Sequence, residues 1–307
     1  MRNSHDTPAL PLWRSIMFVP AVSDRFVESA FKVPADVLQI DLEDSVGPLQ
    51  KDEARARAGG IADRFAAAGR NVSVRVNRPW RMLVRDLEAS VRESVLAIAL
   101  PKVPDASFVQ SVAEVLAELE REQGLPIGHT RIITMVEDAE GLANMNEIAA
   151  AHTRVVGQIV GAEDLAVSMR MGVEDDSLYV PNVMNVTACR RAGVMPVGFI
   201  GSVADFKDQD AFRVRIVRAR KLGFESAFCV HPAQVGIINQ EFAPSAAEVE
   251  YATGMLAEFE REVKNGRAAF TYKGRMVDLP VVDQARQVLA RHRLVQAALQ
   301  PSAREAL

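Results

Sequence analysis

The chain has 307 residues, enough for one large barrel with an appendage or for two domains of ordinary size. Apolar residues make up 49% and charged residues 25%, and no apolar run approaches the roughly 20 residues of a membrane-spanning helix. The formal net charge of −4 comes with basic residues scattered among acids, which argues against a nucleic-acid partner. We therefore expect a soluble protein that binds neither nucleic acid nor membrane.

The first residues and the cysteines bear on the compartment. The start, MRNSHDTPALPLWR, lacks the long apolar segment of a secretory signal. The two cysteines, Cys189 and Cys229, lie far apart in the sequence, which does not suggest a disulfide framework. These features predict a cytoplasmic protein.

Eight short apolar segments, rich in Val, Ile and Phe, alternate with helical periodicity along the first 230 residues or so. The predicted strands cover residues 15–19, 37–41, 72–76, 96–100, 131–136, 158–162, 195–199 and 226–230. Predicted helices include residues 24–32, 51–69, 106–124, 141–152, 183–193 and 211–223. Eight such units favour an α/β fold of the (β/α)8 TIM-barrel type. An open doubly wound sheet is the alternative, but no Gly-x-Gly-x-x-Gly follows the first strand.

The pattern changes after His231-Pro232. Residues 243–266 predict a long amphipathic helix begun by a capping box of Ser245 and Glu248. A short hairpin-like piece, residues 268–278, and another helix, residues 279–299, follow. We therefore expect a barrel over residues 1–240 and a helical extension over residues 241–307 that serves as a lid or an oligomerisation arm.

Charged residues gather at the carboxyl ends of the predicted strands, where barrels place their active sites. The acids there are Asp41, Glu43, Asp44, Glu137, Glu163 and Asp164, with Arg75 and Lys102 as basic residues. Such a set suits Mg²⁺, which prefers oxygen ligands and commonly takes one or two carboxylates. Glu137 and Asp164 each follow a strand and are the ligand candidates. Any one of these acids could instead simply pair with Arg75, Lys102 or a backbone amide.

Arg75 interrupts an apolar strand with a charge, which is costly unless the charge is paired or faces a polar site. It could form a structural ion pair with Asp41 or Glu43, or hold a substrate carboxylate with its forked guanidinium. Zinc-type Cys/His spacing, a Gly-x-Ser-x-Gly elbow and a Walker loop are all missing from the sequence. Nucleophilic serine or cysteine chemistry is therefore disfavoured.

Seven motifs in order carry a resemblance to a known family: RSIMFVP (14–20), IDLEDSV (40–46), VRVN (74–77), ALPKV (99–103), GAEDLA (161–166), HPAQV (231–235) and GRMVDLPVVDQA (274–285). Together they resemble the HpcH/HpaI aldolase/citrate lyase family, in the branch of the citrate lyase beta subunit and malyl-CoA lyase. The resemblance implies a (β/α)8 barrel and carbon–carbon cleavage or condensation of an acyl-CoA with a small oxo acid. It also implies Mg²⁺, with Mn²⁺ as an alternative ion.

The resemblance also implies roles for particular residues. Glu137 and Asp164 would bind the metal, and the backbone around Ala162 and Glu163 would receive the oxo-acid carboxylate. Arg75 would hold the substrate carbonyl or carboxylate, and Asp41, Glu43 and Asp44 would form an outer shell that holds the metal's waters and orients Arg75. Asp278 would transfer a proton from the C-terminal lid, usually onto a neighbouring subunit of a homotrimer or hexamer. From the residues alone, Asp278 could equally be the N-cap of the following helix.

The positions that resemble CoA contacts are Phe18, Pro20, Arg25 and Lys102. The sequence departs from the family beside them, with Ala21 in place of glycine and Ser29 in place of lysine, although Lys32 lies one turn on. It also departs at Pro181-Asn182 and Val197-Gly198. The acyl partner is therefore expected to differ from citryl-CoA. The alternatives are an aldolase for free hydroxy-oxo acids, an acyl-CoA thioesterase and a non-catalytic subunit.

Overall fold

The computed structural model describes residues 10–267 and 269–299. The chain separates into two compact units, one ending at Asn239 and the other beginning at Gln240. The outer ends of the two expected regions, residues 1–9 and 300–307, and residue 268 of the expected hairpin lie outside the described residues.

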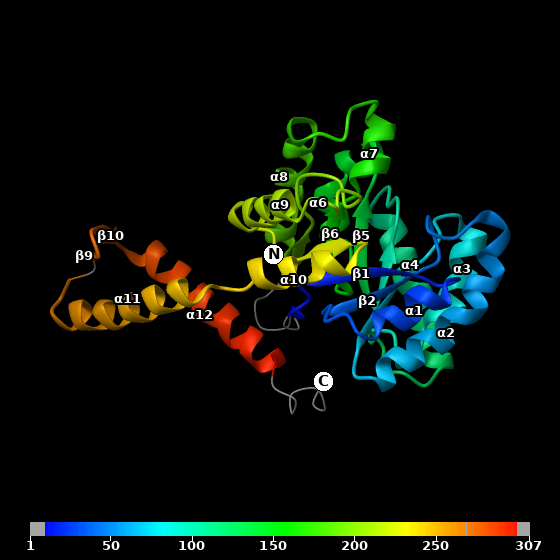
Figure 1. Cartoon of the computed structure of the whole chain (residues 1–307), viewed down its shortest axis with the longest axis horizontal. Helices are drawn as coiled ribbons and strands as arrows, with labels where there is room; N and C mark the ends of the chain where they lie inside the picture. The colour runs from blue at the N-terminus through cyan, green and yellow to red at the C-terminus, as the bar shows by residue number, and fades with distance from the viewer. Residues whose placement is uncertain (1–9, 268, 300–307) are drawn as a thin grey trace. The chain divides into compact units, whose positions relative to one another are not determined.

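The first unit alternates strands and helices (Figure 1). Its strands are β1 (Ser15–Pro20), β2 (Val37–Asp41), β3 (Asn71–Arg75), β4 (Ala97–Leu100), β5 (Arg131–Val136), β6 (Val155–Val160), β7 (Met195–Val197) and β8 (Ala227–Cys229). Its helices are η1 (Pro48–Gln50, a 3-10 turn), α1 (Asp24–Ala30), α2 (Lys51–Ala67), α3 (Trp80–Ser90), α4 (Ala106–Glu122), α5 (Ala139–Ala143), α6 (Met145–Ala149), α7 (Ala162–Met169), α8 (Asp175–Ala192), α9 (Gln209–Leu222) and α10 (Pro232–Glu241), which crosses into the second unit.

The eight strands pair in parallel, in the order β7-β6-β5-β4-β3-β2-β1-β8. The two ends of this sheet meet, since Val197 forms an isolated parallel bridge to Ser226 and the Gly198 amide donates to the Ser226 carbonyl over 2.8 Å. Neighbours in the sheet are neighbours in sequence, and helices separate them. The fold is a nearly closed (β/α)8 barrel, as predicted, and not an open doubly wound sheet.

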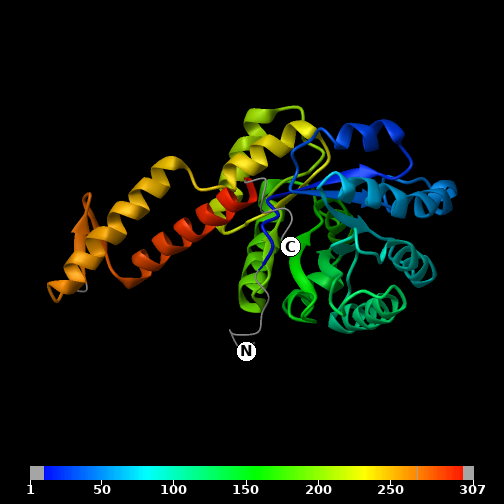
Figure 2. The same cartoon turned by 90° about the horizontal axis from the view of Figure 1, so that it is seen from below.

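The barrel strands are buried on both faces, which explains their continuous apolar runs. Their inward side chains form a core cluster that includes Ile16, Val37, Ala99, Ile133 and Met135. Figures 1 and 2 both show the helices of this unit outside the strands. The interior is mainly apolar, although the Ser73 hydroxyl donates a hydrogen bond to Oε1 of Gln39 between β3 and β2.

Short acidic side chains begin several of the helices that leave the barrel mouth. Asp105 accepts a hydrogen bond from the Phe108 amide at the start of α4, and Asp138 accepts one from the Gly141 amide at the start of α5. Asp138 turns the chain into a helix directly after Glu137. The cap therefore fixes where the end of β5 points.

The second unit contains α11 (Ala246–Lys264), β9 (Phe270–Tyr272), β10 (Arg275–Val277) and α12 (Leu279–Leu299). The predicted capping box starts α11, with Ser245 and Glu248 bonded reciprocally. Figures 1 and 2 show α11 and α12 side by side, joined through the hairpin. They share an apolar cluster around Met255, Val277 and Val282. The role of this unit as a lid stays a prediction. Among the described residues, no helix is long and apolar enough to cross a membrane.

Candidate functional site

Charged side chains at the ends of β2, β3 and β5 face the inside of the barrel. Side chains alternate along a strand, so Glu137 lies on the same side as Ile133 and Met135, which belong to the interior cluster. Asp41 and Arg75 are register partners at the ends of β2 and β3. The mouth of the barrel therefore collects both acids and a base.

Arg75 is held in a fixed orientation. Its Nε and Nη2 donate to the two carboxylate oxygens of Asp41 over 2.7 and 2.8 Å, and its Nη1 donates to Asp44 over 3.2 Å. The guanidinium carbon also lies 4.6 Å from the centre of the Phe18 ring. In the described part of the chain these bonds use three of the five guanidinium N–H groups, so others remain for a substrate oxygen.

Burial and pairing act in opposite directions on this ion pair. Burial alone would raise the pKa of Asp41, but the hydrogen bonds and charge of Arg75 bring it below its usual value. Burial likewise disfavours the guanidinium, yet Asp41 raises the pKa of Arg75 above its ordinary value. Both groups therefore stay charged, although Asp41 is only 1% exposed.

Glu43 lies between the two bases of the mouth. Its Oε1 accepts a hydrogen bond from the Lys102 ammonium over 3.0 Å. Its Oε2 lies 3.0 Å from Nη1 of Arg75, but the geometry is not that of a hydrogen bond, and this buried oxygen has no hydrogen-bond partner among the described residues. Burial raises the pKa of Glu43, which Arg75 and Lys102 only partly offset. Lys51 stabilises the loop after β2 that contains Glu43, because its ammonium donates a hydrogen bond to the Glu43 carbonyl over 2.7 Å.

Glu137 is a buried acid, 4% exposed, at the end of β5. Its Oε2 accepts a hydrogen bond from the backbone N–H of Lys102 over 2.7 Å. Burial raises the pKa of Glu137 to about 8, and the nearby charges of Glu43 and Asp164 add to this effect. A bound cation would stabilise the ionised form of Glu137, because it would replace the hydration that the carboxylate loses on burial.

Gly161 makes room for that carboxyl group, a role that its position in the sequence did not indicate. A side-chain carbon at this position would collide with Oε1, Cγ and the carboxyl carbon of Glu137. Gly161 is also the N-cap of α7, with an extended backbone and no side-chain cap. The glycine therefore permits the close approach of β5 and the start of α7.

Asp164 reaches the mouth from the first turn of α7. Its Oδ1 lies 3.4 Å from the Lys102 ammonium, and its side chain is 38% exposed. Glu163 is exposed and accepts a hydrogen bond from the Ser202 hydroxyl, while Ala162 is buried. The structure thus brings Asp164 to the same lysine that contacts Glu43 and Glu137, whereas Glu163 pairs with a neighbouring loop.

The donor set fits a hard divalent cation. Over residues 10–267 and 269–299, no three Asp, Glu, His or Cys side chains form a ready-made metal cage. Mg²⁺ does not require one, because it commonly keeps several waters and takes one or two carboxylates. Glu137 and Asp164 would supply the carboxylate oxygens, and the unpaired Oε2 of Glu43 would accept a hydrogen bond from a coordinated water.

The remaining candidates lie in different surroundings. Phe18 stacks edge-on against Phe228, and Arg25 is an exposed residue of α1. Lys102 contacts acids with its ammonium, as described above. Asp278 belongs to the second unit and accepts a long 3.4 Å hydrogen bond from the Val281 amide at the start of α12. The N-cap geometry expected as one reading of Asp278 is therefore present, and a catalytic role stays a prediction.

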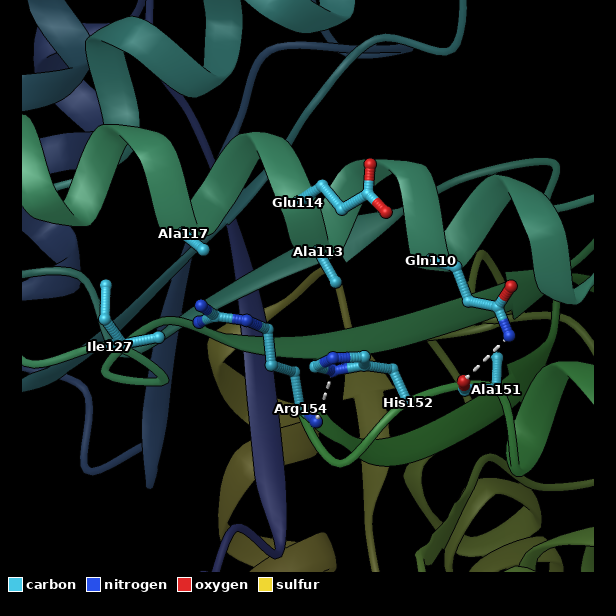
Figure 3. A pocket seen from close by; sticks show the side chains of 8 residues that line it. All are labelled: Gln110, Ala113, Glu114, Ala117, Ile127, Ala151, His152 and Arg154. Carbon is cyan, nitrogen blue, oxygen red and sulfur yellow. Dashed lines mark hydrogen bonds between the residues drawn. The ribbon is translucent and has the colours of Figure 1, made fainter.

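A separate groove of about 410 Å³ opens beside α4, at the amino-terminal end of β6 (Figure 3). Its lining includes Gln110, Glu114, Ile127, His152 and Arg154. Arg154 immediately precedes β6, so the groove lies at the end of the barrel opposite the mouth. In a barrel enzyme this end carries stability and the mouth carries chemistry.

Comparison with known proteins agrees with the motifs at the mouth. Residues 14–232 match the family model HpcH/HpaI aldolase/citrate lyase. The chain belongs to this family.

Relatives cover nearly the whole length of both chains. The L-malyl-CoA/beta-methylmalyl-CoA lyase of Rhodobacter capsulatus is 32% identical over 293 residues, covering 88% of this chain and 90% of its own. The citrate lyase subunit beta of Escherichia coli strain K12 is 31% identical over 286 residues, covering 92% and 93%. The crystal structure of CitE from Mycobacterium tuberculosis, in complex with magnesium, acetoacetate and coenzyme A, has a TM-score of 0.71 and 27% identity, covering 93% of this chain and 99% of its own.

These matches confirm the predicted family and branch. The two relatives above are named a lyase and a lyase subunit, so the prediction of an enzyme of the lyase class is also confirmed. The names of the relatives do not identify the substrate of this chain, and they do not test the individual site residues.

Proposed function

We propose that this protein is a Mg²⁺-dependent carbon–carbon lyase that cleaves or condenses a β-hydroxyacyl-CoA thioester and a small oxo acid. The thioester is of the malyl-, citramalyl- or citryl-CoA type. The observation that carries the proposal is the convergence of Glu137, Asp164 and Arg75 at one barrel mouth. Relatives at 32% and 31% identity are a malyl-CoA lyase and a citrate lyase subunit, which supports it.

Glu137 and Asp164 would hold the ion. When bound, Mg²⁺ supplies a Lewis acid that draws negative charge from the carbonyl and carboxylate oxygens of the oxo acid. The protein shields one side of this site from water, because Glu137 is buried. The backbone N–H of Lys102 fixes the position of one of the carboxylate oxygens of Glu137. Mn²⁺, which prefers similar oxygen ligands, is the alternative ion.

Arg75 would stabilise the charge that develops during cleavage. When the substrate hydroxyl loses its proton and the adjacent carbon–carbon bond breaks, the oxo acid is released and the electron pair of that bond stays on the thioester fragment. The charge is delocalised onto the thioester oxygen as an enolate, which then takes up a proton. A guanidinium already fixed by Asp41 needs no reorientation to donate to that oxygen, so its dipoles are preorganised. In condensation the same contact stabilises the enolate before it attacks the oxo acid.

The start of α7 would receive the carboxylate of the oxo acid. The first backbone N–H groups of a helix have no partner within the helix, and its N-terminus carries partial positive charge. In α7 these groups belong to Ala162, Glu163 and Asp164, and Gly161 provides no side-chain cap that would compete. A carboxylate bound there lies beside Asp164, one of the proposed metal ligands.

The thioester side is proposed to use Phe18, Pro20, Arg25 and Lys102, and the proton-transfer group is proposed to be Asp278 from the second unit. In that arrangement Asp278 reaches the barrel of a neighbouring subunit in a homotrimer or hexamer. An acid on a mobile cover can exclude water and deliver a proton only when the substrate is in place.

The test is a Mg²⁺ titration of the cleavage reaction with malyl-CoA, citramalyl-CoA and citryl-CoA. Release of glyoxylate, pyruvate or oxaloacetate is measured, with a chelator-treated sample as the blank. We expect one oxo acid to appear in proportion to acetyl-CoA and only with the metal. Free CoA without an oxo acid would indicate a thioesterase, and cleavage of free hydroxy-oxo acids alone would indicate a CoA-independent aldolase. No turnover of any of these would contradict the proposal.

A further inference from the structure

Lys102 uses three of its groups in the barrel mouth. Its backbone N–H donates to Glu137, and its carbonyl accepts a hydrogen bond from Nε of Arg78 over 3.0 Å. Its ammonium lies 3.0 Å from Oε1 of Glu43 and 3.4 Å from Oδ1 of Asp164. Lys102, in the loop that follows β4, therefore contacts three acids: Glu43 and Glu137 after β2 and β5, and Asp164 in the first turn of α7.

The backbone of Lys102 adopts a conformation that side chains rarely take. Its φ angle is 49°, in the left-handed region that normally favours glycine. Such strain persists only when the surroundings hold it, and here the bonds to Glu137 and Arg78 do so. The conformation lets the N–H and the ammonium serve the same group of acids.

The position of the ammonium is the second observation. It lies between Glu43 and Asp164, and Asp164 is one of the two proposed metal ligands. The contact to Glu43 is a hydrogen bond, whereas the contact to Asp164 is longer and is an ion pair by distance only. The link to Asp164 is therefore the weaker of the two, and Asp164 is also the more exposed acid.

We propose that Lys102 is an internal competitor for the divalent cation. In the metal-free protein its ammonium neutralises Glu43 and Asp164 and keeps both carboxylates in the mouth. A metal ion can bind the Asp164 carboxylate only when the Lys102 ammonium moves away from it. The ammonium then keeps its hydrogen bond to Glu43. Lys102 thus keeps the acids assembled at the cost of metal affinity. The inference rests on the proposed function only for the assignment of a divalent cation to this mouth.

The test is the affinity for Mg²⁺ and Mn²⁺, measured by titration calorimetry on the full chain without substrate. Lys102→Met keeps the length and the strained backbone but removes the charge. We expect it to bind Mg²⁺ at least about tenfold more tightly, because a positive charge within ion-pair distance of a ligand no longer opposes the ion. The metal-free variant should also melt at a lower temperature, since three acids then repel one another.

Two further variants separate charge from fold. Lys102→Gly removes the charge and relieves the backbone, so it should also tighten binding even if Lys102→Met folds poorly. Lys51→Met removes a charge nearby, but Lys51 donates to the carbonyls of Leu42 and Glu43 and not to the carboxylates. Its effect on affinity should be clearly smaller.

The inference is overturned if both Lys102 variants bind the metal no more tightly than the wild type, or if Lys51→Met gives the same gain. Should the wild type bind Mg²⁺ yet cleave no thioester, the proposed function fails while the affinities still decide the role of Lys102. If neither wild type nor variants bind a divalent cation, both the metal assignment and this inference fail.

Discussion

Glu137 is a buried carboxyl group with other acids around it. Its backbone hydrogen bond from Lys102 does not offset burial and the charges of Glu43 and Asp164, so the pKa of Glu137 rises to about 8. Proteins keep such unfavourable groups where they serve a ligand, and active sites are where shifted pKa values gather. Arg75 is the opposite case, a buried base whose charge is balanced by two hydrogen bonds to the Asp41 carboxylate.

The pKa of Glu137 leads to a pH-dependent prediction for the metal-free protein. Because the folded pKa lies above the unfolded value, the folded state binds the extra proton between about pH 4.5 and 8, and stability falls as the pH rises through that window. Glu137→Gln removes the group that ionises, and with it this loss of stability. We expect the variant to be more stable than the wild type at pH 8, by up to about 4 kcal/mol, with little difference at pH 5. Urea denaturation at the two pH values measures it.

Glu137→Gln should also abolish the stabilisation of the protein by bound Mg²⁺. Added Mg²⁺ should raise the melting temperature of the wild type but not that of Glu137→Gln, and cleavage should fall by about a hundredfold or more. A variant that is less stable than the wild type at pH 8 without metal would show that the Glu137 carboxylate is already satisfied within the chain.

Asp41 and Asp44 provide a matched pair for testing how Arg75 is held. Asp41→Asn leaves a buried guanidinium without its main partner and should cost about 3 kcal/mol of stability. It should also lower kcat more than it changes KM, because Arg75 acts on the developing charge. Asp44→Asn removes a 58% exposed partner and should cost less than about 1 kcal/mol. Urea denaturation and steady-state kinetics measure both; equal effects from the two variants would contradict the geometry.

Among the helices and strands, the sequence predicts those boundaries that depend on residues close by in the chain. The capping box of Ser245 and Glu248 and the start of α12 at Leu279 follow from neighbouring residues, and the structure has both. Helix α8 shows the limit, because it begins at Asp175 although its periodicity indicated residues 183–193. Pro181 lies inside it, and a proline normally ends a helical pattern when a sequence is read. A capping box of Glu174 and Ser177 begins the helix earlier.

Some features of the site could likewise be predicted from the sequence, and others depend on contacts between distant parts of the chain. The strand ends could be read from the apolar runs, and they correctly placed Asp41, Arg75 and Glu137 at the mouth. The contacts of Lys102 could not be predicted, because they depend on a positive φ and on carboxylates that come from the ends of β2 and β5 and from α7. The close approach of Gly161 to Glu137 depends on the same three-dimensional arrangement.

At the other end of the barrel, Glu120 and Arg154 tie α4 to the start of β6. Both guanidinium Nη atoms donate to the carboxylate over 2.6 Å, and the amides of Gly128 and Thr130 donate as well. Burial alone would raise the pKa of Glu120, but these bonds bring it below its usual value. The stabilisation is therefore present above the unfolded pKa and is lost as the pH falls through the folded one.

We expect Glu120→Gln to lose about 3 to 5 kcal/mol of stability at pH 7, since Arg154 remains buried and loses its charged partner. The difference from the wild type should shrink toward pH 4 and below. At pH 7 the remaining folded enzyme should keep its cleavage rate, because the pair is far from the mouth along the strands. As a control, Asp63→Asn removes an exposed ion pair with Arg92 and should cost below about 1 kcal/mol. Urea denaturation series at both pH values decide it.

At the scale of the whole molecule, the barrel and the second unit carry different parts of the proposed chemistry. The barrel holds the proposed metal ligands and Arg75, and the second unit holds Asp278. A small helical hairpin with its own apolar cluster can move as a body while keeping its internal packing. Oligomers place such an arm over a partner when the site of each copy is completed by another.

This arrangement predicts complementation between two inactive variants. Glu137→Gln disables the barrel and Asp278→Asn disables the arm, so each alone should be nearly inactive. If Asp278 acts on a neighbouring subunit, co-expressed and co-purified mixed oligomers contain sites that combine an intact barrel with an intact arm. With random mixing, about a quarter of all sites should be intact, because half the barrels and half the arms are intact, and removing the parent oligomers should raise the rate to about a third of the wild type in a trimer and leave it near a quarter in a hexamer. Separate tags on the two variants and a two-step purification isolate the mixed species, and oxo-acid release measures their rate. Mixed oligomers as inactive as their parents would place Asp278 over the barrel of its own chain.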